Sequence, residues 1–186
     1  EGIRMAREAL AAARDDPSTL RLAGNAIGYL AHDFEAGLAA VRRALTLNPN
    51  SAQVLNSAAW THNHACLPES AIPLFERAMR LSPLDPEMAY MMSGIGMAHL
   101  IAGNPAAAIP WGERSVQQGP NWGAGHRVLI ASLMLVGRTA DARSAVSAFL
   151  SVTPQTRKLD TILTNWRSRE FAERYVAALR AAGLPG

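Results

Sequence analysis

The chain has 186 residues, of which 49% are hydrophobic and 18% are charged, so it can bury a sizeable core. Its 35 alanines outnumber its 24 valines, isoleucines and threonines, and because alanine favours helices over strands, the composition predicts an all-α fold. The single cysteine excludes a disulfide framework and favours a reducing, cytoplasmic location.

The net charge of +3 argues against nucleic acid as a partner, because the bulk of the chain has no clustered basic footprint. From Pro154 onward there are six basic and three acidic residues, whereas residues 1–153 carry twelve of each. These C-terminal arginines could contact an acidic partner, but a run of this kind is more often a solvated helix face.

Apolar periodicity, glycines, prolines and capping residues predict eleven helices. In chain order they span residues 2–14, 18–31, 34–47, 51–65, 68–81, 86–102, 105–118, 122–136, 139–152, 154–165 and 168–182. Asn104 and Thr153 each precede a proline at a helix start and are predicted to cap it, and Ser168 to cap the last helix. The uncharged stretch Met88–Ala102 is too short to cross a bilayer of roughly 30 Å, so we expect a buried helix and no membrane partner.

Similar residues recur along the chain at intervals near 34. Prolines follow the predicted helices at intervals of 32, 34, 37 and 34 residues, and a period in this range indicates stacked repeats. Four series share this phase: the prolines Pro17, Pro49, Pro83, Pro120 and Pro154; the small residues Gly37, Ala71, Ala108 and Ala142; the residues seven positions later, Ala44, Ala78, Ser115 and Phe149; and the turn residues His32, Cys66, Gly103 and Gly137.

These series resemble the tetratricopeptide repeat (TPR), a helix-turn-helix unit of 34 residues with small residues where its helices cross. The matching stretches are Gly37–Pro49, Ala71–Pro83, Gly103–Pro120 and Gly137–Pro154, although the aromatic and Leu-Gly signature of the first helix is degenerate. The resemblance implies a TPR-like right-handed α-solenoid of antiparallel helix pairs with a C-terminal helical cap. We expect a half repeat over 1–17, containing a second helix only, repeats over 18–51, 52–88, 89–122 and 123–155 (18–155 in all), and capping helices over 156–186.

Packing explains the phased series. Stacked helix pairs bury what a single pair leaves exposed, and alanine or glycine lets the backbones approach closely. The turn between paired helices favours a residue that tolerates positive φ, which suits Gly103 and Gly137. His32 and Cys66 suit it less, so we expect less regular turns there.

The ending Tyr175–Gly186 is similar to the C-terminal tail of bacterial class III adenylate/guanylate cyclases that carry a TPR array after the catalytic domain. This resemblance implies the regulatory or scaffolding region of a bacterial, cytoplasmic signalling protein whose cyclase domain precedes residue 1. No catalytic residue of that domain can be transferred, so we expect neither enzymatic activity nor a cofactor in this chain.

In TPR-like stacks the first helix of each repeat lines a concave groove. The predicted groove contains amide groups, a hydroxyl group, a cation and apolar area. This mixture suits an extended peptide, a partner helix or the preceding domain of the same chain. Trp60 and Tyr90 could equally fill the core between helices. Transferred by position, the candidate groove residues are Gln53, Asn56, Trp60, Asn63, His64, Tyr90, Ser93, Met97, Arg127, Ala131 and Met134.

Two other functions remain open. Exposed ends of a solenoid can stack, which would make the chain a self-association module and a homodimer. The second is a metal-dependent enzyme built on His62, His99 and Cys66. The spacing His62-x-His64-x-Cys66 argues against a metal site, because helical residues two apart point about 200° away from each other and zinc needs three or four convergent ligands.

Overall fold

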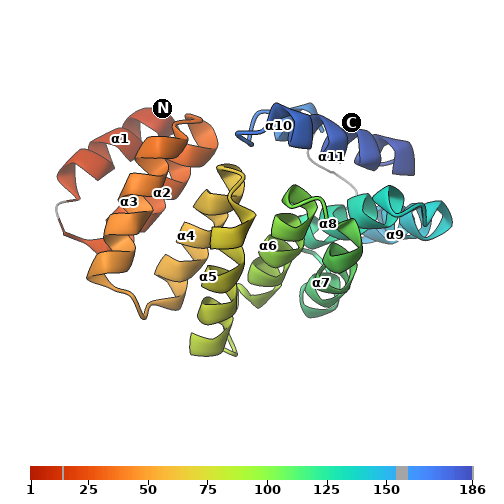
Figure 1. Cartoon of the computed structure of the whole chain (residues 1–186), viewed down its shortest axis with the longest axis horizontal. Coiled ribbons are helices and arrows are strands. Elements are labelled where there is room, and N and C mark those ends of the chain that lie inside the picture. Colours follow the sequence, from red (N-terminus) through yellow and green to blue (C-terminus); the bar gives the residue numbers. More distant parts are fainter. Residues whose placement is uncertain (14, 154–158, 186) are drawn as a thin grey trace. The chain divides into compact units, whose positions relative to one another are not determined.

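The computed structural model of the chain describes residues 1–13, 15–153 and 159–185. Over these ranges the chain forms eleven helices and no strands, which confirms the all-α, TPR-like solenoid class (Figure 1). The helices are α1 (Gly2–Ala12), α2 (Pro17–Leu30), α3 (Phe34–Leu47), α4 (Ala52–His64), α5 (Pro68–Leu81), α6 (Met88–Ile101), α7 (Pro105–Gln118), α8 (Gly123–Leu135), α9 (Thr139–Val152), α10 (Asp160–Leu163) and α11 (Arg169–Ala182).

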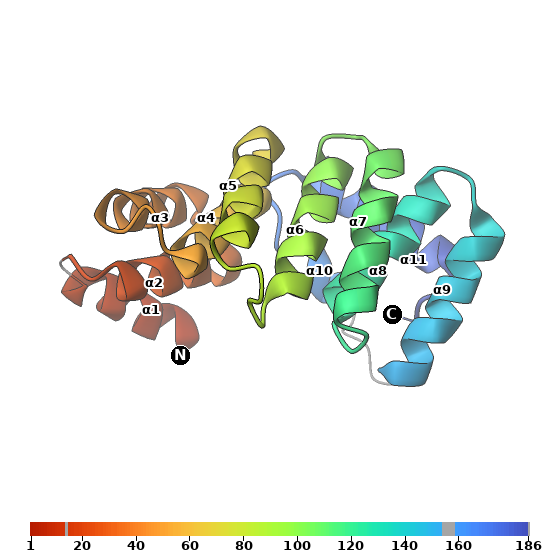
Figure 2. The same cartoon turned by 90° about the horizontal axis from the view of Figure 1, so that it is seen from below.

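The helices divide between two compact units. Unit 1 comprises Glu1–Pro83 together with Asn165–Arg167, and unit 2 comprises Leu84–Thr164 together with Ser168–Gly186. In unit 1, α2 packs against α3 and α4 against α5; in unit 2, α6 packs against α7 and α8 against α9 (Figure 2). The repeat boundaries given above remain a prediction.

The predicted helix ends lie within two residues of the observed ones for every helix except the tenth. Within the described part of the predicted helix 154–165, residues 159–165, the helix spans Asp160–Leu163, and Thr164 and Asn165 form a turn, so this prediction was too long at its C-terminal end. Residues 154–158, including the Pro154 that Thr153 was predicted to precede as a cap, lie outside the described residues.

The phased small residues lie where the helices cross. Ala71, Ala108 and Ala142 are completely buried, as are Ala44, Ala78 and Ser115 seven positions later in their repeats. At Gly37 the two helix backbones nearly touch: a Cβ atom there would lie 2.8 Å from the carbonyl oxygen of Gly24 and 3.2 Å from the Cα of Gly28. These contacts confirm that the repeat period records helix packing.

The turns within the helix pairs share one backbone conformation. Gly103 and Gly137 have φ values of 78° and 83°, and His32 and Cys66 adopt 55° and 57°. The expectation of a less regular turn was wrong at Cys66, because Leu67 N donates to His62 O at 2.9 Å just as Asn104 N donates to His99 O at 2.8 Å. The repeat geometry therefore imposes the left-handed conformation even where it costs about 1–2 kcal/mol.

The helix caps agree only in part with the sequence. Ser168 Oγ accepts from Phe171 N at 3.2 Å, which confirms the predicted cap of α11. Asn104 makes no side-chain capping bond, so the cap predicted at the start of α7 was wrong. Helix α6 is largely buried, as expected, and among the described residues no helix is long and apolar enough to cross a membrane.

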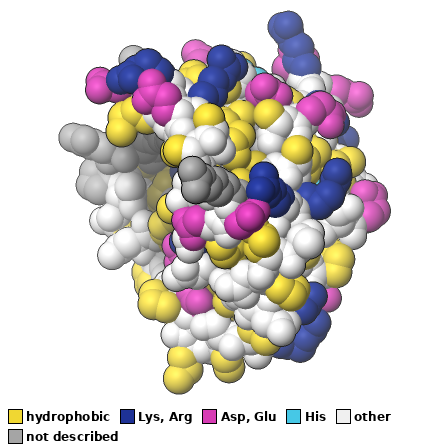
Figure 3. Space-filling view, turned by 90° about the vertical axis from the view of Figure 1, so that its left-hand side faces the viewer, with side chains coloured by type: hydrophobic (Ala, Val, Ile, Leu, Met, Phe, Trp, Pro, Cys, Tyr) yellow, Lys and Arg dark blue, Asp and Glu magenta, His cyan; other side chains and the backbone are white. Residues whose placement is uncertain are grey.

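The surface mixes apolar and charged side chains. Figure 3 shows the molecule from the side on which α1, α2 and α3 lie, with apolar side chains interspersed among acidic and basic ones. Exposed large apolar residues of unit 1 include Ile3, Met5, Leu22 and Leu30. Scattered apolar side chains of this kind are normal on a soluble surface and indicate no binding site by themselves.

We expect Gly37→Ala to lower the free energy of unfolding by about 1–3 kcal/mol, because the new methyl group would collide with backbone atoms of α2. Gly28→Ala at the same crossing is the matched control, since its Cβ would meet only Thr61 Cγ2 at 3.7 Å. That variant should gain about 0.5–1 kcal/mol from helix propensity. Equal effects of the two changes in chemical denaturation would contradict this account of the crossing.

Candidate peptide-binding site

A strip of polar side chains joins α2 to α4 in unit 1. Arg21 donates to Gln53 Oε1 at 3.1 Å and to Ser57 Oγ at 3.2 Å. One helical turn further along α2, Asn25 donates to Thr61 Oγ1 at 3.4 Å and to Ser57 O at 3.5 Å. We call Arg21, Asn25, Gln53 and Ser57 the polar strip. Gln53 is exposed and the other three are half-buried, so an incoming chain could reach them.

The strip ends at an aromatic cluster centred on His64. The imidazole ring centroid lies 4.9 Å from that of Tyr29, 5.9 Å from that of Trp60 and 5.0 Å from that of Trp166. Trp60 also packs edge-on against Phe75 of α5, with centroids 5.7 Å apart. We call His64, Tyr29, Trp60 and Phe75 the aromatic cluster. Trp166, from the C-terminal part of the chain, packs on it.

The non-helical tripeptide Asn165–Arg167 lies against this cluster. His64 Nδ1 donates to the Asn165 carbonyl oxygen at 3.1 Å, and Arg167 N donates to the His64 carbonyl oxygen at 2.9 Å. The Asn165 amide donates to the Tyr29 hydroxyl at 3.1 Å. Trp166 is 8% exposed and His64 is 6% exposed, so this contact is largely dry.

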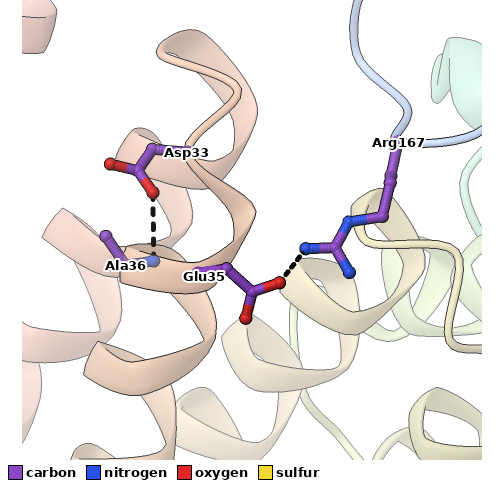
Figure 4. Close-up of polar contacts among 4 residues, drawn as sticks. All are labelled: Asp33, Glu35, Ala36 and Arg167. Atoms are coloured by element: carbon purple, nitrogen blue, oxygen red, sulfur yellow. Dashed lines mark hydrogen bonds and ion pairs between the residues drawn. The ribbon is translucent and has the colours of Figure 1, made fainter.

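Arg167 completes the contact at the start of α3. Its guanidinium forms an ion pair with Glu35 and lies over the Phe34 ring, 5.4 Å from the centroid (Figure 4). Asp33 accepts from Ala36 N at 3.2 Å, which caps α3 and fixes the helical turn that carries Glu35 (Figure 4). Because the Glu35 side chain is 80% exposed, the pair contributes less than about 1 kcal/mol and mainly sets orientation.

The predicted groove residues of unit 1 do not form an open surface. Gln53 is exposed, but Asn56, Trp60, Asn63 and His64 are buried. Trp60 packs against Phe75, between the helices of one pair, which is the core placement that the sequence left open. His64 is covered by the tripeptide Asn165–Arg167, so the chain itself occupies this part of the predicted groove.

In unit 2 the predicted groove residues are also partly covered. Ser93, Met97 and Ala131 are buried, whereas Tyr90, Arg127 and Met134 are half-buried. Ser93 Oγ donates to Tyr90 O at 2.8 Å within α6, and the Tyr90 ring packs edge-on against Trp122. Helix α11 packs on α8 and brings the Tyr175 hydroxyl to Arg127. Burial raises the pKa of Tyr175 to about 12, and Arg127 opposes this shift.

The tail that resembles cyclase tails is mostly core. Tyr175, Val176, Leu179, Ala182 and Leu184 are all buried. The spacing that carries the resemblance therefore coincides with the apolar face that α11 packs inward.

The basic residues of the C-terminal part contact this chain. Arg169 pairs with Glu173 at 2.8 Å, Arg180 pairs with Asp160, and Arg174 donates to Leu100 O at 3.3 Å. Arg157 and Lys158 lie outside the described residues.

The described ranges contain no group of three or more His, Cys, Asp or Glu side chains placed to hold a metal ion. His62 Nδ1 donates to Ala58 O at 2.8 Å within its own helix.

Two parts of this site were not predicted from the sequence. Arg21, Asn25 and Tyr29 recur every fourth residue along α2, and that spacing could have revealed a shared face. Asn165 and Trp166 carried no such signal, because their partner His64 lies about a hundred residues earlier in the chain.

A family model described as tetratricopeptide repeat matches residues 29–86 and 67–121, which together span half of the chain. The chain belongs to the tetratricopeptide-repeat family. No curated protein matches it in sequence. Solved TPR structures match the fold alone, because the identities are at or below 20%.

PilW, described as a widely conserved type IV pilus biogenesis factor, is 20% identical, with a TM-score of 0.71 over 95% of this chain and 78% of its own. YrrB, described as a TPR protein with an unusual peptide-binding site, is 19% identical, with a TM-score of 0.58 over 95% and 90%. MamA from Desulfovibrio magneticus RS-1 is 20% identical, with a TM-score of 0.60 over 82% of each chain.

Acidification should destabilise the fold through His64. Burial lowers the pKa of His64 to about 4, although its bond to Asn165 opposes the shift. The unfolded chain binds this proton near pH 6.5, so unfolding takes up a proton between pH 6.5 and 4, and the free energy of unfolding falls as the pH falls. We expect a loss on the order of 3 kcal/mol by pH 4, measured by urea denaturation, and a clearly smaller loss in His64→Gln. A variant with the same pH dependence as the wild type would contradict this.

Trp60→Ala should lower the free energy of unfolding by about 3–5 kcal/mol, because it empties a buried aromatic site beside Phe75. Guanidinium denaturation measures the loss. An unchanged denaturation midpoint would instead mean that Trp60 has no core role.

Proposed function

We propose that this chain is a protein-interaction module that binds an extended segment of a partner protein along the polar strip and aromatic cluster of unit 1. The observation that carries the proposal is the tripeptide Asn165–Arg167, which lies on this surface as a bound peptide would. Both its backbone and its side chains form hydrogen bonds to α2 and α4.

The chemistry of the surface suits an extended ligand. Aromatic rings provide apolar contact area at low entropy cost, and amide and hydroxyl groups can pair with the backbone of an incoming segment. Gln53 and Arg21 continue the surface beyond the tripeptide. In unit 2, the half-buried Tyr90, Arg127 and Met134 remain candidates for the same role.

Family membership supports the proposal, because TPR arrays stack helix pairs into extended binding surfaces. The description of YrrB names a peptide-binding site on the same fold. That name does not locate a site in this chain, so the placement in unit 1 rests on the contacts of Asn165–Arg167.

We further propose that the module is the regulatory or scaffolding region of a bacterial, cytoplasmic cyclase-like signalling protein. Its only support is the resemblance of Tyr175–Gly186 to cyclase tails. The sequence of the parent gene tests it: we expect a class III cyclase catalytic domain in the same reading frame, and a reading frame without one would contradict the proposal.

Peptide display tests the binding function. We expect selection on the full chain carrying Trp166→Ala to yield peptides whose affinity drops at least tenfold when Arg21→Ala or Tyr29→Ala is added. Both changes remove groups of the proposed surface. Arg21→Ala breaks hydrogen bonds that are only half-buried, so the fold should tolerate it. Isothermal calorimetry with the selected peptides measures the change.

Arg80→Ala is the matched control for Arg21→Ala, since Arg80 is an exposed arginine at the end of α5. It should leave the affinity unchanged. A selection that yields no binders, or binders equally sensitive to the changes at Arg21 and Arg80, would refute the proposed surface.

A further inference from the structure

We propose that Asn165–Arg167 is an internal ligand of the unit 1 site, and that the partner displaces it with a segment carrying an amide, an aromatic ring and a guanidinium on consecutive residues. This inference rests on the proposed function and adds two things to it. It gives the chemical class of the partner segment, and it makes access to the site depend on release of the chain's own tripeptide.

Each residue of the tripeptide is recognised by a different group of unit 1. The Asn165 amide meets the Tyr29 hydroxyl, the Trp166 ring meets the His64 imidazole, and the Arg167 guanidinium meets the Glu35 carboxylate. Two backbone bonds with His64, one donated and one accepted, fix the register of the segment. Such side-chain readout on a fixed backbone is how peptide-binding sites achieve specificity.

The chemistry of this contact differs from that of the repeat core. A core cluster of unit 1 is formed by the apolar residues Ala13, Leu20, Ala44 and Val54, which come from the end of α1 and from α2, α3 and α4. At the tripeptide, the buried side chains of His64 and Asn165 both carry hydrogen-bonding groups. Buried polar groups that pair across a contact are typical of recognition interfaces.

The tripeptide can be released without dismantling the helix pairs. It is short and non-helical, and the residues on both sides of it, Thr164 and Ser168, belong to unit 2. The Arg167–Glu35 ion pair is exposed to solvent, so a competing guanidinium can reach Glu35. The phased contacts of α2 with α3 and of α4 with α5 involve none of these three residues.

Because the tripeptide is part of the same chain, it competes strongly with any outside segment. An attached ligand competes at an effective concentration in the millimolar range, so an outside segment with the same contacts binds weakly until the tripeptide is removed. Emptying the site should therefore raise the affinity for an added peptide by at least about tenfold.

The test uses a fluorescent peptide with the sequence of residues 161–169. By fluorescence anisotropy, it should bind the full chain carrying Trp166→Ala and Arg167→Ala at least tenfold more tightly than the wild type. Arg167→Glu alone is a second host; this change at an exposed side chain repels Glu35 and should open the site to a smaller extent than the double change, because Trp166 remains in place. Equal binding to the wild type and both open hosts, or no binding to hosts that circular dichroism shows to be folded, would overturn the inference.

A charge exchange identifies the contact. In the host carrying Trp166→Ala and Arg167→Ala, the further change Glu35→Arg should weaken peptide binding severalfold. A peptide that carries Arg167→Glu should recover the lost affinity. Glu76→Arg on α5 is the matched control, because it makes the same charge change at another exposed glutamate of unit 1. An equal loss from both host changes, without recovery, would refute recognition of the guanidinium by Glu35.

The two proposals fail in different ways. If library peptides bind through Arg21 and Tyr29 but the 161–169 peptide does not bind the open hosts, the interaction module stands and the internal ligand is wrong. If neither kind of peptide binds, the proposed function fails as well.

Discussion

The whole structure depends on how closely the paired helices approach each other. At Gly37 the backbones of α2 and α3 are so close that a methyl group has no room, and the equivalent alanines of the later pairs are completely buried. This contact provides many dispersion interactions between backbones and little apolar area. The crossing points therefore need no large side chains, and the aromatic residues of unit 1 can gather at the end of α4.

At the contact between the aromatic cluster and Asn165–Arg167, affinity and specificity come from different interactions. Burying an aromatic side chain such as Trp166 contributes about 1.5–3 kcal/mol, whereas the solvated Arg167–Glu35 pair contributes less than about 1 kcal/mol. The ring therefore provides most of the attraction. The ion pair and the hydrogen bonds of Asn165 select which segment fits. Any partner that takes the place of the tripeptide has to satisfy both requirements.

The sequence was sufficient to predict the fold because the fold is local. Helix packing repeats every 34 or so residues, so Gly37, Ala71, Ala108 and Ala142 each report the same short-range contact. It was not sufficient to predict the site. His64 was predicted to line a groove and is buried beneath Asn165–Arg167, and nothing in a periodic pattern says which distant segment covers it. At Cys66 the residue type alone was misleading. Cysteine is poorly suited to positive φ, yet it adopts the left-handed turn that the repeat geometry requires.

The wide separation of His64 from Asn165 in the sequence has a consequence for how the protein is made. A ribosome adds roughly 5–20 residues per second, and N-terminal helices fold while the rest is still being synthesised. Residues 65–165, which are 101 in number, therefore take on the order of 5–20 s to emerge. During that interval Asn165–Arg167 does not yet cover the aromatic cluster of nascent unit 1, so the proposed partner would meet no internal competitor.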